Sequence, residues 1–261
     1  MDATIVRCET KARKHSPNAC DSIGADVVMS VVEELYAAFA DVPRPVELEG
    51  CPCCVGPDEG RPLLARPLRA LSAAELARYA AKALNTWGGP ADFHYFAPRL
   101  LELAADDAFI WPDAEIVFIK FGRAGWQDWP QRDAVTAFLN AFWTRILAAF
   151  PTRPSVDTAL CALAGTNADM EPWLDEWGGA LTSEPAARHL HEFVTEQLVW
   201  RRGKPRLINA FWDVSSRPYQ QVVEWLTGGA AVAAASAAFA RTEDEAALEL
   251  LIDIESFLRP A

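Results

Sequence analysis

Apolar residues recur with helical spacing most regularly between Gln131 and Phe150. They stand at positions i, i+3, i+4, i+7, i+8, i+11, i+12 and i+15, occupied by Val135, Phe138, Leu139, Phe142, Trp143, Ile146, Leu147 and Phe150. This spacing places all of them on one broad face of an α-helix. Pro130 suits the first helical turn, and Pro151 ends the run. We therefore predict a long, buried helix at the centre of the fold.

The same periodicity predicts helices along most of the remaining chain. Ser72 and Thr242 each stand three residues before a glutamate, which is the capping-box pattern of a helix start. Gly178 and Gly179 predict a helix end. A strand over residues 115–121 is a second interpretation, and we favour a helix there because both neighbouring segments are helical. The expected helical ranges are 26–39, 72–84, 92–105, 113–122, 156–164, 169–177, 185–200, 207–212, 216–228, 230–240 and 243–258.

These helices follow one another through short connections, and no convincing strand pair interrupts them. Such an order is typical of bundles and of stacked helical hairpins. Residues 96–100 and 170–174 share an aromatic residue, a central proline and a leucine, as degenerate HEAT-type hairpins do. The predicted fold class is all-α, with stacked helical hairpins that are HEAT-like or form an irregular bundle. We expect one domain over residues 25–261 and a mobile, polar and basic segment over residues 1–24.

The charge of the chain narrows the range of partners. Its formal net charge of −12 argues against nucleic acids and anionic membrane surfaces, whose phosphates the protein would repel. A basic protein is compatible with this charge, and so is the simpler role of keeping the chain soluble. No apolar stretch has transmembrane length, and the N-terminus lacks the apolar core of a secretory signal. A cytoplasmic protein with reduced thiols is the resulting expectation.

The most specific chemical motif is the run Cys51-Pro52-Cys53-Cys54. Its C-x-x-C spacing lets two sulfur atoms meet over one tight turn, where they can form a disulfide or supply half of a tetrahedral zinc site. Cys53 is a candidate third ligand, and His94 or Cys161 can complete the set through the fold. A thioredoxin-like role requires a preceding strand and a following helix, and the pattern favours neither. Small thiols in a structured loop are the remaining interpretation.

An acidic and aromatic run covers residues 169–177. Trp173 and Trp177 lie four residues apart and share one helix face, while Asp175 and Glu176 stand between them. Aromatic rings beside carboxylates can bind a cationic ligand or an arginine-rich partner. Core packing requires the same spacing of tryptophans, and we favour the core for the two rings.

A further candidate is the set His189, Glu192 and Glu196, which share one face of the expected helix. An imidazole and carboxylates on one face can bind a metal or transfer protons. Because no second helix carries a matching His-and-Glu motif, we favour a solvated helix face. The sequence contains no glycine-rich phosphate loop, G-x-S-x-G elbow or H-E-x-x-H motif.

Several motifs between Tyr36 and Trp143 together resemble a family of bacterial proteins to which no activity is attached. The motifs are Ala40-Asp41-Val42-Pro43-Arg44-Pro45, Cys51-Pro52-Cys53-Cys54, Thr86-Trp87-Gly88, Asp92-Phe93, Phe96-Ala97-Pro98-Arg99-Leu100-Leu101-Glu102-Leu103 and Gly125-Trp126. They cover less than half of the chain. The resemblance implies a bacterial, intracellular and helical protein, and it implies no reaction.

Two functional hypotheses follow from the sequence. The first is a non-enzymatic, acidic interaction module, of adaptor or immunity type, that binds a basic partner. It rests on the acidic surface, the helical hairpins and the lack of a recognisable catalytic set. The second is a metal-binding protein, with zinc as the candidate ion, or a thiol-redox protein that uses Cys51, Cys53 and Cys54.

Overall fold

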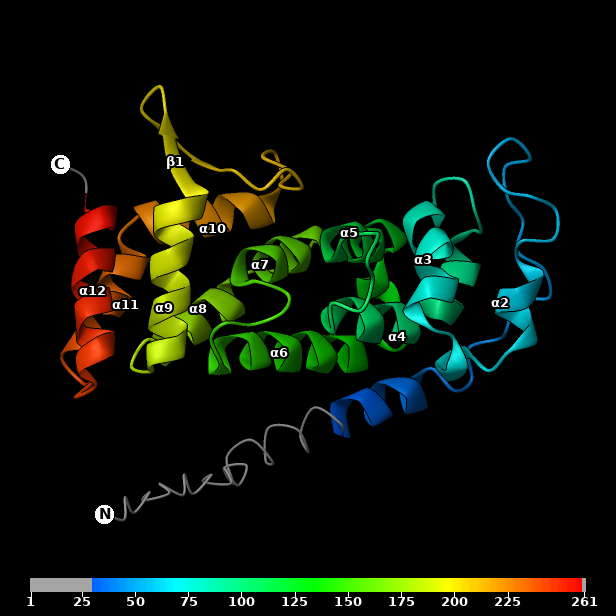
Figure 1. Ribbon diagram of the computed structural model, residues 1–261, viewed down its shortest axis with the longest axis horizontal. Coiled ribbons are helices and arrows are strands. Elements are labelled where there is room, and N and C mark those ends of the chain that lie inside the picture. The colour runs from blue at the N-terminus through cyan, green and yellow to red at the C-terminus, as the bar shows by residue number, and fades with distance from the viewer. Residues whose placement is uncertain (1–29, 260–261) are drawn as a thin grey trace, which may run out of the picture.

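The computed structural model describes residues 30–259 (Figure 1), and the segment expected to be mobile, residues 1–24, lies outside this range. The described chain is all-α apart from one two-stranded sheet, which confirms the predicted fold class. Residues 30–38 form a first helix. The elements that follow are α2 (Arg61–Ala65), η1 (Leu68–Ala70), α3 (Ala73–Lys82), α4 (Pro90–Ala105), α5 (Ala114–Ala124), η2 (Trp126–Asp128), α6 (Arg132–Ala148), α7 (Val156–Gly165), α8 (Glu171–Ala180), α9 (Glu184–Glu192), η3 (Phe193–Gln197), β1 (Leu198–Arg201), β2 (Lys204–Leu207), α10 (Arg217–Thr227), α11 (Ala230–Phe239) and α12 (Glu245–Leu258).

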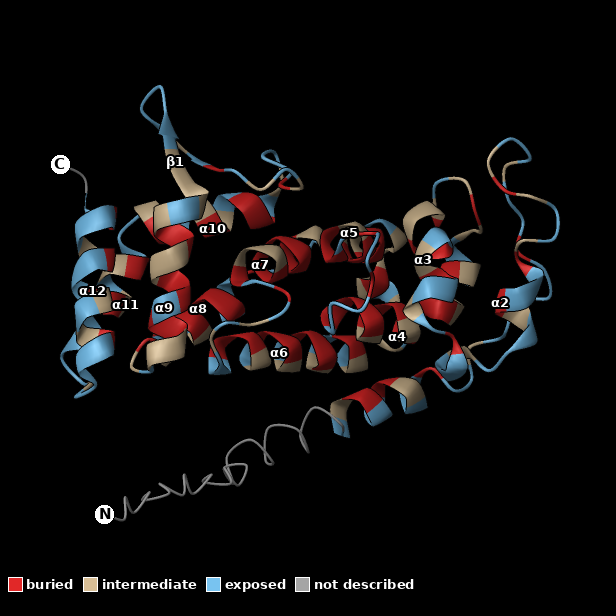
Figure 2. Cartoon of the chain, in the orientation of Figure 1, coloured by how far each residue is buried: buried red, intermediate tan, exposed pale blue. Residues whose placement is uncertain are grey.

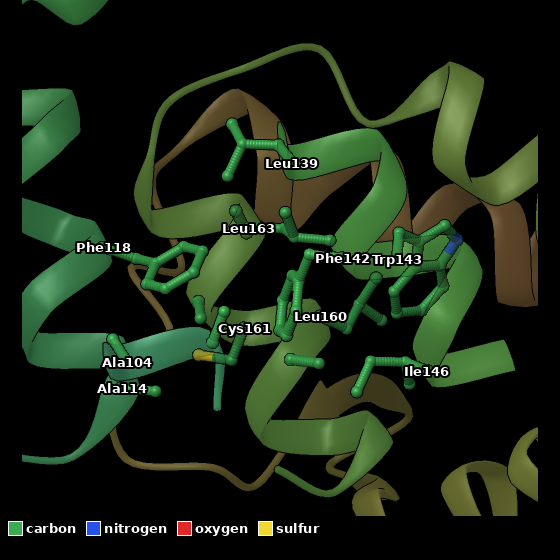
Figure 3. Close-up of a cluster of buried hydrophobic side chains, with 14 of the residues drawn as sticks. Ala104, Ala114, Phe118, Leu139, Phe142, Trp143, Ile146, Leu160, Cys161 and Leu163 are labelled. Carbon is green, nitrogen blue, oxygen red and sulfur yellow. The ribbon is translucent and has the colours of Figure 1, made fainter. Parts of the chain in front are cut away.

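Helix α6 is the predicted central helix, and it lies parallel to the long axis, in its central part and on the lower side of the helical body in Figure 1. It contacts α7, α8 and α9. Its predicted apolar face is buried from Val135 to Leu147. Figure 3 shows Phe142, Trp143 and Ile146 of this face beside Leu160 of α7. The periodicity therefore identified the correct helix and its buried side.

A single hydrophobic core joins the elements on both sides of α6 (Figure 2). Neighbours in sequence pack together, as α4 and α5 do, but so do helices that are separated in sequence, such as α5 with α7 and α9 with α12. The contact of α5 with α7 is especially close. A Cβ atom added to Gly122 would lie 2.6 Å from the carbonyl oxygen of Gly165, and one added to Gly165 would lie 2.7 Å from Cγ1 of Ile119. Only glycine permits this approach of two helix backbones.

One predicted helix end near residue 180 is wrong. The pair Gly178-Gly179 does not end its helix, because α8 continues to Ala180. Gly178 is buried, and its missing side chain lets α11 approach, since an added Cβ would lie 3.0 Å from Cβ of Ala234. Here glycine serves helix packing, and tertiary contact overrides its tendency to end a helix.

The expected helix over residues 185–200 is also wrong in its second half. Helix α9 ends at Glu192, the wider turn η3 follows, and β1 then pairs with β2 in an antiparallel hairpin. The expected helix over 207–212 is absent, because Leu207 belongs to β2 and residues 208–212 form no helix. Arg202 and Gly203 have φ values of 54° and 74°. Positive φ at both central residues is the mark of the two-residue turn that matches the twist of a β-hairpin.

The predicted N-terminal caps of the helices agree in part with the caps in the structure. Ser72 and Glu75 form the expected capping box of α3. Asp92 occupies the third position of α4 and accepts a hydrogen bond from the Gly89 amide, because Pro90 opens this helix two residues earlier than expected. At α12 the cap is Asp244, whose carboxylate accepts from two backbone amides, so the predicted cap at Thr242 is displaced by two residues.

Within residues 30–259 no single helix has both the length and the apolar composition to cross a membrane. The bent pair α10 and α11 passes the same test only when its two helices are taken together.

The contact of α5 with α7 supplies a stability prediction. Gly122→Ala places a methyl group against a backbone carbonyl that cannot rotate away, so we expect a loss of about 1–3 kcal/mol in the free energy of unfolding. Gly179→Ala is the matched control, because it lies in the last turn of α8 with no atom near its added Cβ. The control should gain up to about 1 kcal/mol. Chemical denaturation measures both changes, and equal stabilities for the two variants would contradict the proposed contact.

Candidate metal centre

The three cysteines lie in a loop that is fixed to the helical body by backbone hydrogen bonds. The Cys51 amide donates to the Thr86 carbonyl at 2.8 Å, and the Gly88 amide donates to the Glu49 carbonyl at 2.7 Å. Within the loop, the amides of Cys54 and Val55 both donate to the Cys51 carbonyl, at 2.8 and 2.9 Å. The loop is therefore a tight turn held on both sides rather than a free connection.

This turn brings the three sulfur atoms together. The Sγ atoms of Cys51 and Cys53 lie 2.8 Å apart, and those of Cys53 and Cys54 lie 3.4 Å apart. All three sulfurs lie within 4.8 Å of one another, and among the described residues they are the one group of possible metal-binding side chains that converges in this way. Cys53 is exposed, whereas Cys51 and Cys54 are partly buried.

The thiols of the cluster differ in acidity. Hydrogen bonds from the Cys53 thiol and then from the Cys53 amide stabilise the Cys51 thiolate and lower its pKa. Interaction with Cys51 and then with Cys54 raises the pKa of Cys53 to about 11. The Lys82 ammonium and the Arg78 guanidinium donate to the Cys54 carbonyl at 2.6 and 2.9 Å. These two side chains of α3 thus hold the Cys54 end of the loop.

The geometry fits a thiophilic metal ion. With zinc–sulfur bonds of about 2.3 Å, neighbouring sulfurs of a tetrahedral site lie about 3.8 Å apart. The Cys51–Cys53 and Cys53–Cys54 sulfur pairs need to separate by roughly 1 Å or less from their present contacts to reach that spacing. Thiolates are the ligands that favour Zn²⁺, Cu⁺ and iron–sulfur clusters. The turn therefore presents three ligands of one chemical type to a single point.

The other proposed ligands lie elsewhere. The His94 imidazole stacks against the Trp129 ring, with 4.3 Å between the ring centroids, and its Nε2 lies 2.9 Å from Oε1 of Gln131. Cys161 is buried in α7, where its Sγ lies 3.7 Å from Oδ1 of Asn209. Neither residue belongs to the converging group. The sequence alone cannot show this, because both placements depend on how distant helices pack.

The acidic and aromatic run is divided between core and surface. The Trp173 and Trp177 rings are buried, and their indole N–H groups donate to Oδ1 of Asn140 and to the Ala186 carbonyl. Asp175 is exposed and Glu176 is partly exposed. The preference for the core is thus correct for the rings, while the carboxylates remain available on the surface of α8.

The residues His189, Glu192 and Glu196 do not share an open face. The His189 imidazole is buried, its Nε2 lies 2.8 Å from the Ala149 carbonyl oxygen, and burial lowers its pKa. Glu196 is exposed and lies within the wider turn η3, which breaks the expected helical spacing. The imidazole therefore serves helix packing.

The structure contains a polar cluster of Glu115, Asp157 and Asn209 that the sequence did not predict. The Asn209 amide donates to Oε1 of Glu115 at 2.9 Å and to Oδ2 of Asp157 at 2.8 Å. Burial raises the pKa of both carboxyl groups, and it also raises that of the Cys161 thiol. Glu115 and Asn209 are 94 residues apart, and no motif connects them. This cluster links α5, α7 and the segment after β2 with polar contacts inside the core.

Comparison with models of protein families, with curated proteins and with solved structures gives no match. The cluster of Cys51, Cys53 and Cys54, one of the motifs behind the resemblance to bacterial helical proteins, is present in the structure.

The difference in acidity predicts the order of thiol modification. At pH 7 to 8, with metal removed by chelation, Cys51 should react with iodoacetamide before Cys53, because its lowered pKa leaves more thiolate at that pH. Cys161 should stay unmodified in the folded chain, since it is buried. Peptide mass spectrometry after timed quenching measures the order. Faster reaction at Cys53, the more exposed thiol, would mean that accessibility rather than acidity governs the cluster.

Proposed function

We propose that this protein binds a thiophilic metal ion through Cys51, Cys53 and Cys54, with Zn²⁺ as the first candidate. The observation that carries the proposal is the convergence of three sulfurs on one anchored turn. The tight turn brings the cysteines together, and its anchoring to residues 86–88 holds the three sulfurs in place for an ion. A reducing compartment such as the cytoplasm would keep these thiols free to bind metal.

Three thiolates and a divalent ion leave one position of a tetrahedral site for water or for a ligand from another molecule. Exposed Cys53 marks the solvent side of the cluster, where such a ligand can approach. A bound ion would hold the turn closed, because its bonds to Cys51 and Cys54 add to the backbone contacts with Thr86. In this proposal, metal binding therefore increases the order of the loop that precedes α2.

Metal content tests this proposal directly. Protein purified without an affinity metal should carry about one zinc per chain, and Cys51→Ser combined with Cys54→Ser should abolish it. Elemental analysis with a thiol count on the same sample gives both quantities. Cys8→Ser with Cys20→Ser is the matched control, since it removes two thiols outside the described residues and should leave the metal in place. No metal together with a Cys51–Cys54 disulfide would instead support the thiol-redox alternative.

A second candidate function is binding of a basic protein segment. A groove of about 520 Å³ lies between α8 and α10, and the charged groups in its lining are three carboxylates, Glu171, Asp175 and Glu224, and one cation, Arg217. Leu174 and Trp225 supply apolar surface to the same groove. Carboxylates around an apolar floor suit a segment that carries arginine or lysine beside aliphatic residues. Asp175 is also one of the carboxylates that the sequence selected for this role.

Charge reversal in the groove tests the second function. A fluorescent peptide rich in arginine and leucine should bind the full chain in a salt-sensitive way. Asp175→Lys with Glu224→Lys should weaken binding by roughly tenfold or more, since attraction becomes repulsion. Glu243→Lys with Glu249→Lys is a matched control, because it makes the same change of net charge near the start of α12 at exposed residues outside the groove lining. Equal loss in both variants would show that only the overall charge matters.

A further inference from the structure

The hairpin of β1 and β2 carries a charge opposite to that of the rest of the protein. Arg201, Arg202, Lys204 and Arg206 are all exposed, in a chain whose net charge is −12. Residues 197–212 contain no aspartate or glutamate. None of the ion pairs within residues 30–259 includes one of these four cations. Figure 1 shows the hairpin projecting from the helical body.

The strand register places three of the four cations, Arg201, Lys204 and Arg206, on one face of the hairpin. Arg201 pairs with Lys204, and Val199 pairs with Arg206, so these side chains point the same way. Trp200 pairs with Pro205 and belongs to the opposite face. Like charges directly across a strand pair are unfavourable. The pairing of Arg201 with Lys204 is therefore a local cost of the isolated chain, which a bound anion would relieve.

Apolar side chains lie beside these cations. A hollow of about 600 Å³ is lined by the four cations together with Leu207, Ile208 and Val214. Ile208 and Val214 are each 49% exposed, which is high for aliphatic residues. The surface thus combines positive charge with an apolar floor.

We propose that this hairpin face binds an extended, acidic segment of a partner protein, which adds to the ribbon as a further strand. Among the described residues β1 has one side without a strand neighbour, so its backbone groups can pair with an incoming strand. The outer side of β2 lacks free donors, because Pro205 has no N–H and the Leu207 amide donates to the Tyr219 hydroxyl. In an extended segment, alternate side chains lie on one face. Glutamates at every second position would therefore lie on the same face as the cations, with Arg201 of β1 nearest.

Charge and geometry favour this occupant over two others. A second copy of the same hairpin would place cations against cations. A single-stranded nucleic acid would need stacking surface beside its phosphate contacts, but Trp200 lies on the face opposite the cations. The acidic body of the protein also repels a long polyanion more strongly than a short segment.

Fluorescence anisotropy with the full chain tests the proposal, with a labelled peptide of alternating glutamate and valine as probe. We expect saturable binding that weakens with salt. The triple variant R201S/K204S/R206S should lose roughly tenfold or more in affinity, because three charge contacts disappear while the turn Arg202-Gly203 is kept. Circular dichroism and thermal melting of each variant establish that the fold is intact.

Controls separate the hairpin face from general charge. The matched variant R44S/R61S/R241S removes three exposed cations elsewhere and should keep its affinity. Trp200→Ser alters the opposite face and should also leave the affinity unchanged. Absence of saturable peptide binding, equal loss in the matched variant, or stronger competition by oligothymidylate than by unlabelled peptide would each overturn the proposal.

Discussion

Burial of the aromatic face of α6 is the constraint on which the rest of the structure depends. Trp143 is fully buried, its indole N–H donates to the Trp173 carbonyl at 2.9 Å, and its ring meets Trp177 edge to face with 5.4 Å between the centroids. The Trp177 ring then stacks on Trp225 of α10. Large aromatic side chains supply much of the energy of a core, and the indole donors fix their orientation. This chain of rings links the central helix to the C-terminal helices and so fixes the two carboxylate-bearing walls of the groove between α8 and α10.

The cysteine turn depends on the other end of the same core. Its backbone is held by residues 86–88, and the Trp87 ring there is buried against Tyr79 of α3. Lys82 and Arg78 of that same helix donate to the Cys54 carbonyl. The position of the sulfurs is therefore set by helix packing rather than by the loop alone. A site built this way keeps its ligands near each other before any ion binds, which lowers the entropy lost on binding.

The sequence predicted those features that depend on local periodicity or on adjacent residues. The buried face of α6 follows from spacing, and the meeting of Cys51, Cys53 and Cys54 follows from a tight turn, so both could be expected. The hairpin was missed because β1 continues the apolar pattern of α9, and the positive φ of Arg202 has no clear mark in the sequence. His94 could not be assigned, since its neighbour Trp129 comes from a different segment. The bond of Asn209 to Glu115 likewise depends on tertiary packing alone.

The net charge of the chain does not indicate the local charge of its individual surfaces. A value of −12 argues against a long polyanion, because at large distance only the sum of the charges acts. At contact, however, screening confines each interaction to roughly 8 Å, so a partner meets the local charges only. The groove beside α8 and the hairpin after η3 present opposite signs at that range. The net charge of the sequence does not reveal these two surfaces of opposite charge, because the four clustered cations are outnumbered by carboxylates spread over the helices. Local charge on a defined backbone geometry, rather than the overall balance, therefore determines which partners this protein can distinguish.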